Sequence, residues 1–205
     1  MKCYTPLDLQ AMDRYQRANF VNCLGGFKPA TLIVTQNQSG LSNVALFTNI
    51  VHLGADPALI GFINRPKEAT PHTLANIEST GFFTMNHVGI DQLEAAHQTS
   101  AKYPDGVSEF DHVALTEQVR PEFSVPFVAG SPVQLGMKLV EIMSIKQNGT
   151  YLVIGELVCV FLDEANVAAD GFIDLAEAGS LTTAGLQGYY QPKFVQKLGY
   201  ARPTA

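Results

Sequence analysis

The sequence predicts a small, closed antiparallel β-barrel with helices at its periphery. Apolar segments rich in β-forming residues recur between clusters of turn formers, which indicates about six strands. Most of these segments are joined by short polar turns, and such turns favour antiparallel hairpins. The helix signals fall outside the apolar segments, so the fold class is mainly β with helices that cover the barrel.

Composition bounds the domain count and the classes of partner. A chain of 205 residues, 46% hydrophobic and 16% charged, is expected to form one packed domain over residues 1–205. The net charge of −6 argues against nucleic acid or an anionic membrane as a partner, so an anionic ligand would need a local cluster of cations. Three widely spaced cysteines, with no histidine at ligand spacing, predict reduced thiols in a cytoplasmic protein and no metal site.

Each element follows from a local signal. A helix is expected to begin at Thr5-Pro6, where a capping side chain precedes a first-turn proline, and to end at Gly25-Gly26. Apolar segments bounded by turn formers predict the strands, and capping signals predict two further helices. In chain order these elements are strands 31–34, 42–50 and 59–64, a helix 71–79, a strand 82–88, a short helix 91–97, and strands 133–145 and 150–162.

Two segments lack a regular pattern. Residues 99–132 are rich in Gly, Pro and Ser and are expected to be irregular, and a connection this long is usually functional or contacts a partner. Residues 185–203 are expected to form an ordered tail that is packed by its tyrosines.

A cluster of polar residues near the middle of the chain predicts a phosphate site. The strand that ends at Asn64-Arg65 is followed by a helix start at Thr70-Pro71-His72-Thr73. Thr70 is expected to be the N-cap, and the first turn leaves backbone N–H groups free. Because a helix N-terminus beside an arginine attracts phosphate, this arrangement points to a phosphorylated cofactor or ligand.

Five pieces of the sequence carry a resemblance to a known family. They are SNVALFTNI, ADPALIGFINRP, PHTLANIESTGFFTMN, QTSAKYPDGVSEFD, and the pair VQLGMKLVEI and YLVIGELVCV. In this order they resemble the flavin reductase-like, FMN-binding split-barrel family, which includes flavoredoxin-type proteins. The resemblance implies a six-stranded antiparallel Greek-key split barrel, a homodimer, and one FMN per subunit near the dimer interface. It also implies electron transfer through the flavin, with NAD(P)H as a possible donor.

The resemblance also implies which residues bind FMN. Phe47, Thr48 and Asn49 match the stretch beside the isoalloxazine ring. The phosphate-side loop and helix start are matched by Asn64, Arg65, His72 and Thr73, and the segment that closes over the cofactor by Ser100, Ala101 and Lys102. The Tyr189-Tyr190 pair matches a C-terminal aromatic segment that reaches towards the site in relatives. No catalytic acid or base is assigned, because hydride transfer to flavin needs mainly position and access from the protein.

Several of these residues also fit an ordinary structural interpretation. Arg65 fits a solvent-facing charge at a strand end, and Lys102 fits a surface lysine in a loop. Thr48 and Asn49 fit polar residues that close a strand, and His72 fits an exposed position in a first helical turn. The capped helix start beside Arg65, together with the resemblance, favours the binding interpretation.

The sequence therefore predicts an FMN-binding oxidoreductase that passes electrons from NAD(P)H or from a protein donor. No GxGxxG motif follows a strand, so a nicotinamide is expected to bind transiently on the flavin. Two alternatives stay open, namely a non-catalytic flavin-binding electron carrier and a pyridoxamine-phosphate-oxidase-like enzyme.

Overall fold

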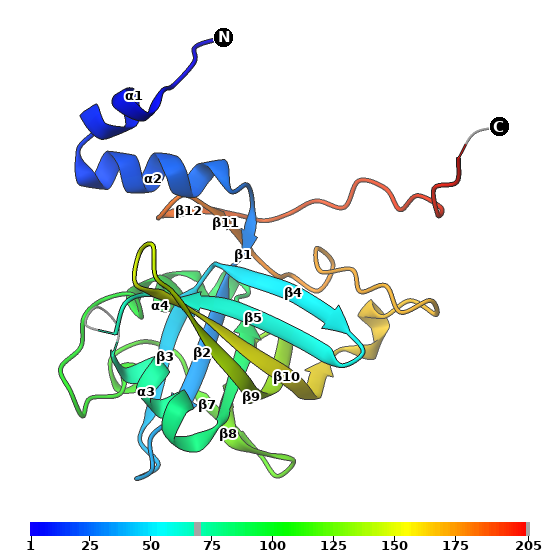
Figure 1. Cartoon of the computed structure of the whole chain (residues 1–205). Coiled ribbons are helices and arrows are strands. Elements are labelled where there is room, and N and C mark those ends of the chain that lie inside the picture. The colour runs from blue at the N-terminus through cyan, green and yellow to red at the C-terminus, as the bar shows by residue number, and fades with distance from the viewer. Residues whose placement is uncertain (68–70, 204–205) are drawn as a thin grey trace.

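A seven-stranded antiparallel sheet forms the centre of the computed structural model, which describes residues 1–67 and 71–203 (Figure 1). The strands, in chain order, are β2 (Thr31–Gln36), β3 (Ser42–Phe47), β4 (Ile50–Ala55), β5 (Ala58–Asn64), β6 (Phe82–His87), β9 (Val133–Ile145) and β10 (Thr150–Leu162). Across the sheet their order is β3-β2-β6-β9-β10-β5-β4, so three hairpins are combined by the pairings β2–β6, β6–β9 and β10–β5. The predicted class, mainly β with peripheral helices, is confirmed.

The two longest strands have the bounds that the sequence predicts. β9 and β10 form a hairpin that turns at Asn148-Gly149, and Gly149 has the positive φ of 72° that this turn requires. The register of this pair shifts between Ile154 and Gly155, where a bulge bends the strand. A Cβ atom on Gly155 would lie 2.7 Å from the ring of Phe83, so a glycine is needed for the close approach of β10 to the core.

Two predictions about strands are wrong in part. The strand expected over 42–50 ends at Phe47, and Thr48-Asn49 form a break before β4 begins at Ile50. The segment 99–132 contains a hairpin of β7 (Glu117–Arg120) and β8 (Phe123–Val128), which the irregular interpretation missed. The polar composition of β7 and the proline within β8 hide this short hairpin from a pattern based on apolar alternation.

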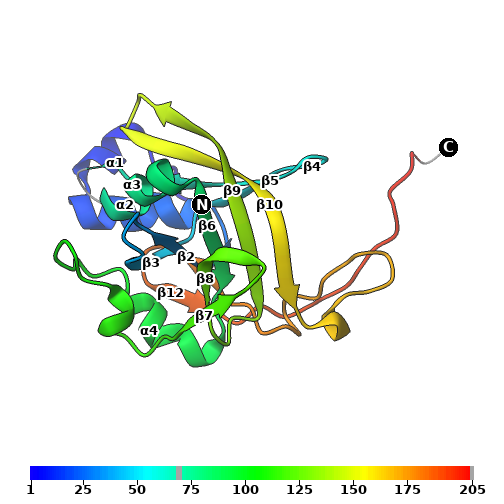
Figure 2. The ribbon, with the colours of Figure 1, turned by 90° about the horizontal axis from the view of Figure 1, so that it is seen from below.

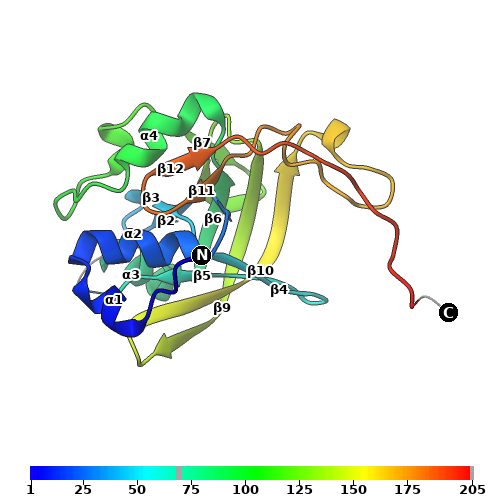
Figure 3. The same ribbon diagram turned by 90° about the horizontal axis from the view of Figure 1, so that it is seen from above.

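The helices depart from prediction at the N-terminus. One helix was expected to end at Gly25-Gly26, but two helices are present, α1 (Pro6–Ala11) and α2 (Arg14–Leu24). The side chain of Asp13 accepts hydrogen bonds from the backbone N–H groups of Tyr15 (2.8 Å) and Gln16 (2.9 Å) and so caps α2. Neither helix buries a residue, and both lie outside the barrel (Figure 3).

Two more helices lie next to the main sheet. α3 (Pro71–Thr80) follows β5, as predicted, but its expected N-cap, Thr70, lies outside the described residues. The sequence predicts a capping box of Asp91 with Glu94 at the start of the short helix 91–97. This prediction is wrong, because α4 (Leu93–Gln98) follows a 3-10 turn, η1 (Ile90–Gln92). The side chain of Gln92 instead accepts a hydrogen bond from the backbone N–H of Gly89 at 3.1 Å.

The tail forms regular structure only as far as Tyr190. A small sheet is formed by β1 (Lys28–Pro29), β11 (Thr182–Ala184) and β12 (Gly188–Tyr190). Beyond Tyr190 the chain has no regular element in the described part and extends away from the barrel (Figure 2).

The core consists of two clusters of buried side chains inside the barrel. Phe62, Phe83 and Met85 belong to one cluster, which packs beneath α3 through Leu74 and Ile77. The other cluster includes Phe127 and side chains of β2 and β3, and it extends to α4 and β12. Because α3 and α4 are anchored to the two clusters, the segments that begin or follow these helices have fixed positions against β3.

Candidate functional site

A cavity of about 470 Å³ lies between β3, the start of α3, the segment after α4 and the β9–β10 turn. We refer to it as the β3–α3 cavity. It is lined by Asn43, Ala45, Leu46, Phe47, Thr48, Asn49, Ile63, Arg65, His72, Thr73, Thr99, Ser100, Ala101, Lys102, Tyr103, Asp105, Glu109, Asn148 and Thr150. This volume lies within the range of small-molecule sites in proteins.

The innermost residues of the β3–α3 cavity are buried and polar. Asn43 on β3 and Thr73 on α3 are each less than a tenth exposed, and the Asn43 amide donates to the Thr73 hydroxyl at 3.2 Å. Glu109 in the 3-10 turn η2 (Glu109–Asp111) is also buried, and its carboxylate accepts from the backbone N–H of Val44 at 2.9 Å. These contacts tie α3 and η2 to the same strand, so the wall of the cavity is rigid.

Cations surround the opening of the cavity. Arg65 and Lys102 are exposed, and among the described residues neither has a carboxylate within ion-pair distance. His72 lies in the first turn of α3 with its Nε2 atom 2.7 Å from a carboxylate oxygen of Asp105. The opening therefore combines two exposed positive charges with the N-terminal end of a ten-residue helix.

The break between β3 and β4 forms another part of the wall. The carbonyl oxygen of Asn49 accepts from the backbone N–H of Ile63 at 3.0 Å, which fixes the break against β5. Phe47 precedes the break, and its ring lies edge-on to Phe62 with centroids 4.9 Å apart. Thr48 is half-buried and Asn49 is exposed, so both present polar groups beside an aromatic ring.

The segment after α4 is held in place by hydrogen bonds to the helix. The hydroxyl of Thr99 donates to the carbonyl of Ala96 at 2.7 Å, and the backbone N–H of Ser100 donates to the carbonyl of His97 at 3.0 Å. Tyr189 on β12 contacts the same helix, with its hydroxyl 2.7 Å from Nδ1 of His97. Tyr189 and Tyr190 are absent from the residues that line the cavity, so Tyr189 reaches the site only through α4.

Most of the residues predicted from the sequence lie together in this cavity. Nine of the ten line it, namely Phe47, Thr48, Asn49, Arg65, His72, Thr73, Ser100, Ala101 and Lys102. Asn64 does not line it; this residue is fully buried behind Arg65, and its amide donates to the Arg65 carbonyl at 2.8 Å. His52 is exposed on β4 and is not one of the described lining residues.

Several lining residues were not predicted. Asn43 lies within a predicted strand, Asn148 lies in a predicted turn, and Thr150 begins a predicted strand, and none of the three carries another functional signal. Tyr103, Asp105 and Glu109 lie in the segment interpreted as irregular. Glu109 lies within YPDGVSEFD, a piece of the sequence that carries the family resemblance. Its place in that piece is the sequence signal that could have identified it.

The buried carboxyl of Glu109 has an altered acidity. Burial raises the pKa of Glu109 above its usual value, while the hydrogen bond from Val44 and the charge of His72 act in the opposite direction. A raised pKa favours the neutral acid, which can stay close to an anion and donate a hydrogen bond to it.

The donors of the β3–α3 cavity suit a phosphorylated aromatic cofactor such as FMN. Arg65, Lys102 and the start of α3 provide charge and N–H groups for a phosphate, and Phe47 provides an apolar face for a ring. Within the described residues no three His, Cys, Asp or Glu side chains are close enough to hold a metal ion. No helix in that part of the chain is both long enough and apolar enough to cross a membrane.

Comparison with known proteins identifies the fold family. Residues 24–175 match the model of the flavin reductase like domain. A crystal structure of a flavin reductase candidate with a split barrel domain, from Shewanella frigidimarina, is 41% identical with a TM-score of 0.94, and the match covers 98% of this chain and 100% of that one. This similarity confirms the split barrel that the resemblance implied, although the main sheet has seven strands where six were expected.

More distant structures share the fold. Component B of nitrilotriacetate monooxygenase from Bacillus cereus is 18% identical with a TM-score of 0.82, over 97% of this chain and 98% of that one. Flavoredoxin of Desulfovibrio vulgaris is 22% identical with a TM-score of 0.72, over 84% and 91% of the two chains. An uncharacterised protein of Halalkalibacterium halodurans is 29% identical over 86% of each chain.

Proposed function

Because the chain belongs to the flavin reductase-like family, we propose that it is an oxidoreductase that binds FMN in the β3–α3 cavity. Electrons are proposed to come from NAD(P)H or from a protein donor. FMN, when bound, supplies the redox chemistry, and the protein supplies binding, orientation and access.

The observation that carries this proposal is the combination of exposed cations and a helix start around one cavity. The phosphate of FMN is close to dianionic, and a guanidinium together with backbone N–H groups is the set of donors that such a group prefers. Arg65 offers a planar fork of donors, Lys102 offers a point charge from the opposite segment, and Thr73 adds a hydroxyl in the first turn of α3.

The ring of the flavin is assigned to the side of the cavity near the break after β3. Phe47 offers contact with a flat aromatic system, and Thr48 and Asn49 offer polar groups for the pyrimidine edge. Hydrogen-bond donors near that edge favour the electron-rich reduced ring, so these two residues are expected to influence the flavin potential.

Anaerobic stopped-flow absorbance tests the proposed reaction. Mixing the FMN-loaded protein with NADH or NADPH is expected to bleach the flavin band, and dithionite serves as the control that reduces any accessible flavin. If neither nucleotide bleaches the band while dithionite does, the nicotinamide-dependent reaction is wrong. That result would favour the electron-carrier alternative, or a protein donor.

Identification of the extracted ligand by mass tests the choice of cofactor. FMN is the expected mass in ligand released from purified protein. Pyridoxal or pyridoxine phosphate would instead support the oxidase alternative, which uses the same phosphate donors.

A homodimer is part of the same proposal. Apolar side chains on three strands of the main sheet are exposed, namely Val51 and Leu53 on β4, Val140 and Met143 on β9, and Val158 on β10. A second copy of the chain would cover such a surface, and the extended tail beyond Tyr190 exposes further apolar side chains for it, such as Val195 and Leu198. Light scattering at micromolar concentration is expected to give twice the mass of 22.2 kDa, and a monomer would contradict the proposal. The cytoplasmic location expected from the sequence remains a prediction.

A further inference from the structure

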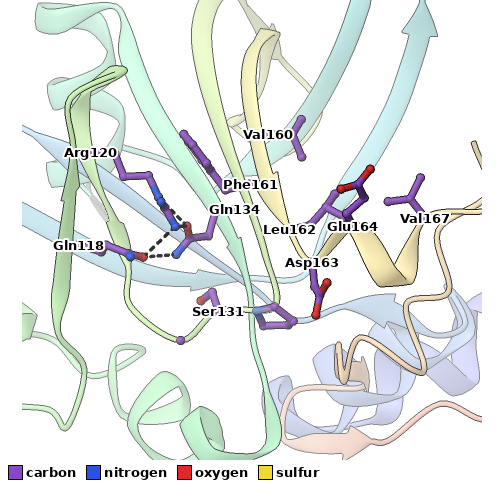
Figure 4. Close-up of a pocket in the computed structure, with 12 residues that line it drawn as sticks. Gln118, Arg120, Ser131, Gln134, Val160, Phe161, Leu162, Asp163, Glu164 and Val167 are labelled. Atoms are coloured by element: carbon purple, nitrogen blue, oxygen red, sulfur yellow. Dashed lines mark hydrogen bonds between the residues drawn. The ribbon is translucent and has the colours of Figure 1, made fainter.

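A second and larger cavity lies at the opposite end of the β9–β10 hairpin (Figure 4). We refer to it as the Arg120 cavity. Its volume is about 730 Å³, and it is lined by Gln118, Arg120, Gly130, Ser131, Pro132, Gln134, Val160, Phe161, Leu162, Asp163, Glu164 and Val167. It shares no lining residue with the β3–α3 cavity, which meets the hairpin at its turn.

Arg120 is held rigidly in the wall of this cavity. Its guanidinium carbon lies 4.1 Å from the centre of the Phe161 ring, close enough for a cation–π contact. Its Nε and Nη2 atoms donate to the side-chain oxygen of Gln134 at 3.1 and 2.8 Å, and Nη2 also lies 3.3 Å from the side-chain oxygen of Gln118. The planar fork is therefore oriented before any ligand arrives.

The hydrogen bonds around Arg120 occupy the acceptor oxygens of two glutamines and leave two donor groups without an acceptor among the described residues. Gln134 is 2% exposed, and its amide nitrogen donates to the Gln118 side-chain oxygen at 2.8 Å and to the carbonyl of Val128 at 2.7 Å. Both glutamine oxygens are thus occupied by Arg120 or by Gln134. The Gln118 amide nitrogen and the Nη1 group of Arg120 have no hydrogen-bond acceptor among the described residues. No carboxylate in the described part of the chain lies within 4.0 Å of the guanidinium. The described residues of this wall therefore offer a positive charge and free donor groups, but no carboxylate that pairs with them.

The opposite wall consists of apolar side chains and of two acidic residues at the end of β10. Val160 is 40% exposed and Val167 is 39% exposed, and Leu162 and Pro132 lie beside them. Asp163 and Glu164 follow at the end of β10, where Asp163 accepts from the backbone N–H of Ala165 at 2.9 Å and so caps the turn η3 (Glu164–Asn166). Two carboxylates near the opening disfavour a ligand with several negative charges, and the apolar side chains favour one with a hydrophobic body.

We propose that the Arg120 cavity binds a small organic acid that carries one carboxylate on an apolar body. The carboxylate pairs with the free edge of the Arg120 guanidinium and with the Gln118 amide, and the body lies against Val160, Leu162 and Val167. The proposal is independent of the flavin, because the two cavities are separate.

Isothermal titration calorimetry of the full chain with benzoate tests this proposal, and benzamide is the uncharged ligand of the same shape. Benzoate is expected to bind at least about tenfold more tightly than benzamide, because an ionised partner strengthens each hydrogen bond. Equal affinities, or no binding of benzoate at millimolar concentration, would overturn the proposal. This comparison uses the unmodified protein, so it does not depend on the folding of a variant.

Two further measurements locate the site. Arg120→Lys keeps the charge but loses the planar fork, so benzoate affinity is expected to fall about tenfold, while the control Glu117→Gln on the exposed side of β7 leaves it unchanged. Unchanged binding in Arg120→Lys would overturn the proposal. Displacement of benzoate by FMN would also overturn the proposal, because benzoate would then bind in the β3–α3 cavity. Inorganic phosphate is expected to bind more weakly than benzoate, and equal affinity would show that the apolar wall has no role.

Discussion

The two cavities hold their cations in different ways. In the Arg120 cavity the guanidinium is stacked on Phe161 and bound by two glutamine oxygens, so its position is set when the protein folds. In the β3–α3 cavity Arg65 and Lys102 are exposed and have no carboxylate partner among the described residues. An exposed side chain keeps much of its rotamer freedom, so we expect Arg65 and Lys102 to become ordered when a ligand binds. The comparison teaches that similar charges give a preformed site in one place and a ligand-ordered site in the other.

The largest expected effect separates the two cavities by their ligand. Arg65→Ala is expected to weaken FMN binding about ten- to a hundredfold, because a charge-assisted phosphate contact contributes about 1.5–3 kcal/mol. A flavin fluorescence titration measures it, with the exposed Lys138→Ala as the control. An unchanged dissociation constant would remove Arg65 from the site, and an equal loss in Arg120→Ala would mean that the cavities are not independent.

Riboflavin tests the same phosphate contact by a change in the ligand instead of a change in the protein. It lacks the phosphate, so it is expected to bind several-fold more weakly than FMN to the wild-type protein. The difference should largely disappear in Arg65→Ala, because the donor that recognises the phosphate is then missing. Equal affinity of wild-type protein for both flavins would contradict the phosphate assignment.

The preformed site is expected to contribute to stability. Gln134→Leu removes the acceptor for Arg120 and the donor to the Val128 carbonyl, so unfolding free energy should fall by about 1–3 kcal/mol. Arg65→Ala, at an exposed position, should change it by less than about 0.5 kcal/mol. Urea unfolding measures both variants. Equal losses of unfolding free energy in the two variants would show that the contacts of Arg120 stabilise the fold no more than Arg65 does.

A smaller effect concerns the dependence of stability on pH. We expect it from the buried carboxyl of Glu109 in the β3–α3 cavity. Burial raises the pKa of Glu109 in the folded state above its usual value of 4.5, so the folded protein holds this proton more tightly than the unfolded chain. The resulting stability is complete below pH 4.5 and is lost as the pH rises through the folded pKa. Glu109→Gln keeps an oxygen for the Val44 N–H and should flatten this part of the stability profile above pH 4.5. An identical pH profile in the variant would show that Glu109 does not titrate there.

The smallest expected effect on stability comes from the break after β3. Asn49 is exposed, so Asn49→Leu should leave unfolding nearly unchanged. The flavin spectrum or reduction potential should shift, because a polar group beside the ring is lost. Spectroelectrochemistry measures the potential, and an unaltered spectrum and potential would place the ring elsewhere.

The β3–α3 cavity could be predicted from the sequence because its residues lie at ends of elements. Arg65 follows a strand, His72 and Thr73 begin a helix, and each signal is local in the sequence. Glu109 was missed because its segment has no regular pattern, and its burial depends on packing against β3. The break at Thr48 was also missed, because the residues on both sides favour strands equally.

The Arg120 cavity could not be predicted in this way. Gln118, Gln134 and Phe161 come from three different strands, and no motif joins them in the sequence. Their contact depends on the pairing of β7 with β8 and of β9 with β10 in the folded barrel. Such a site emerges only from tertiary structure.

The contact between Tyr189 and His97 has a consequence for the order of events during synthesis. Tyr189 follows every strand of the main sheet in the sequence, and β12 pairs with β11, which in turn pairs with β1. A nascent chain that ends at Leu162 contains every strand of the main sheet, yet it lacks the tyrosine that braces α4 and the segment leading to Lys102. Long-range contacts of this kind form late. We therefore expect the strands of the main sheet to pair first and the β3–α3 cavity to reach its final shape only after β12 has joined β11.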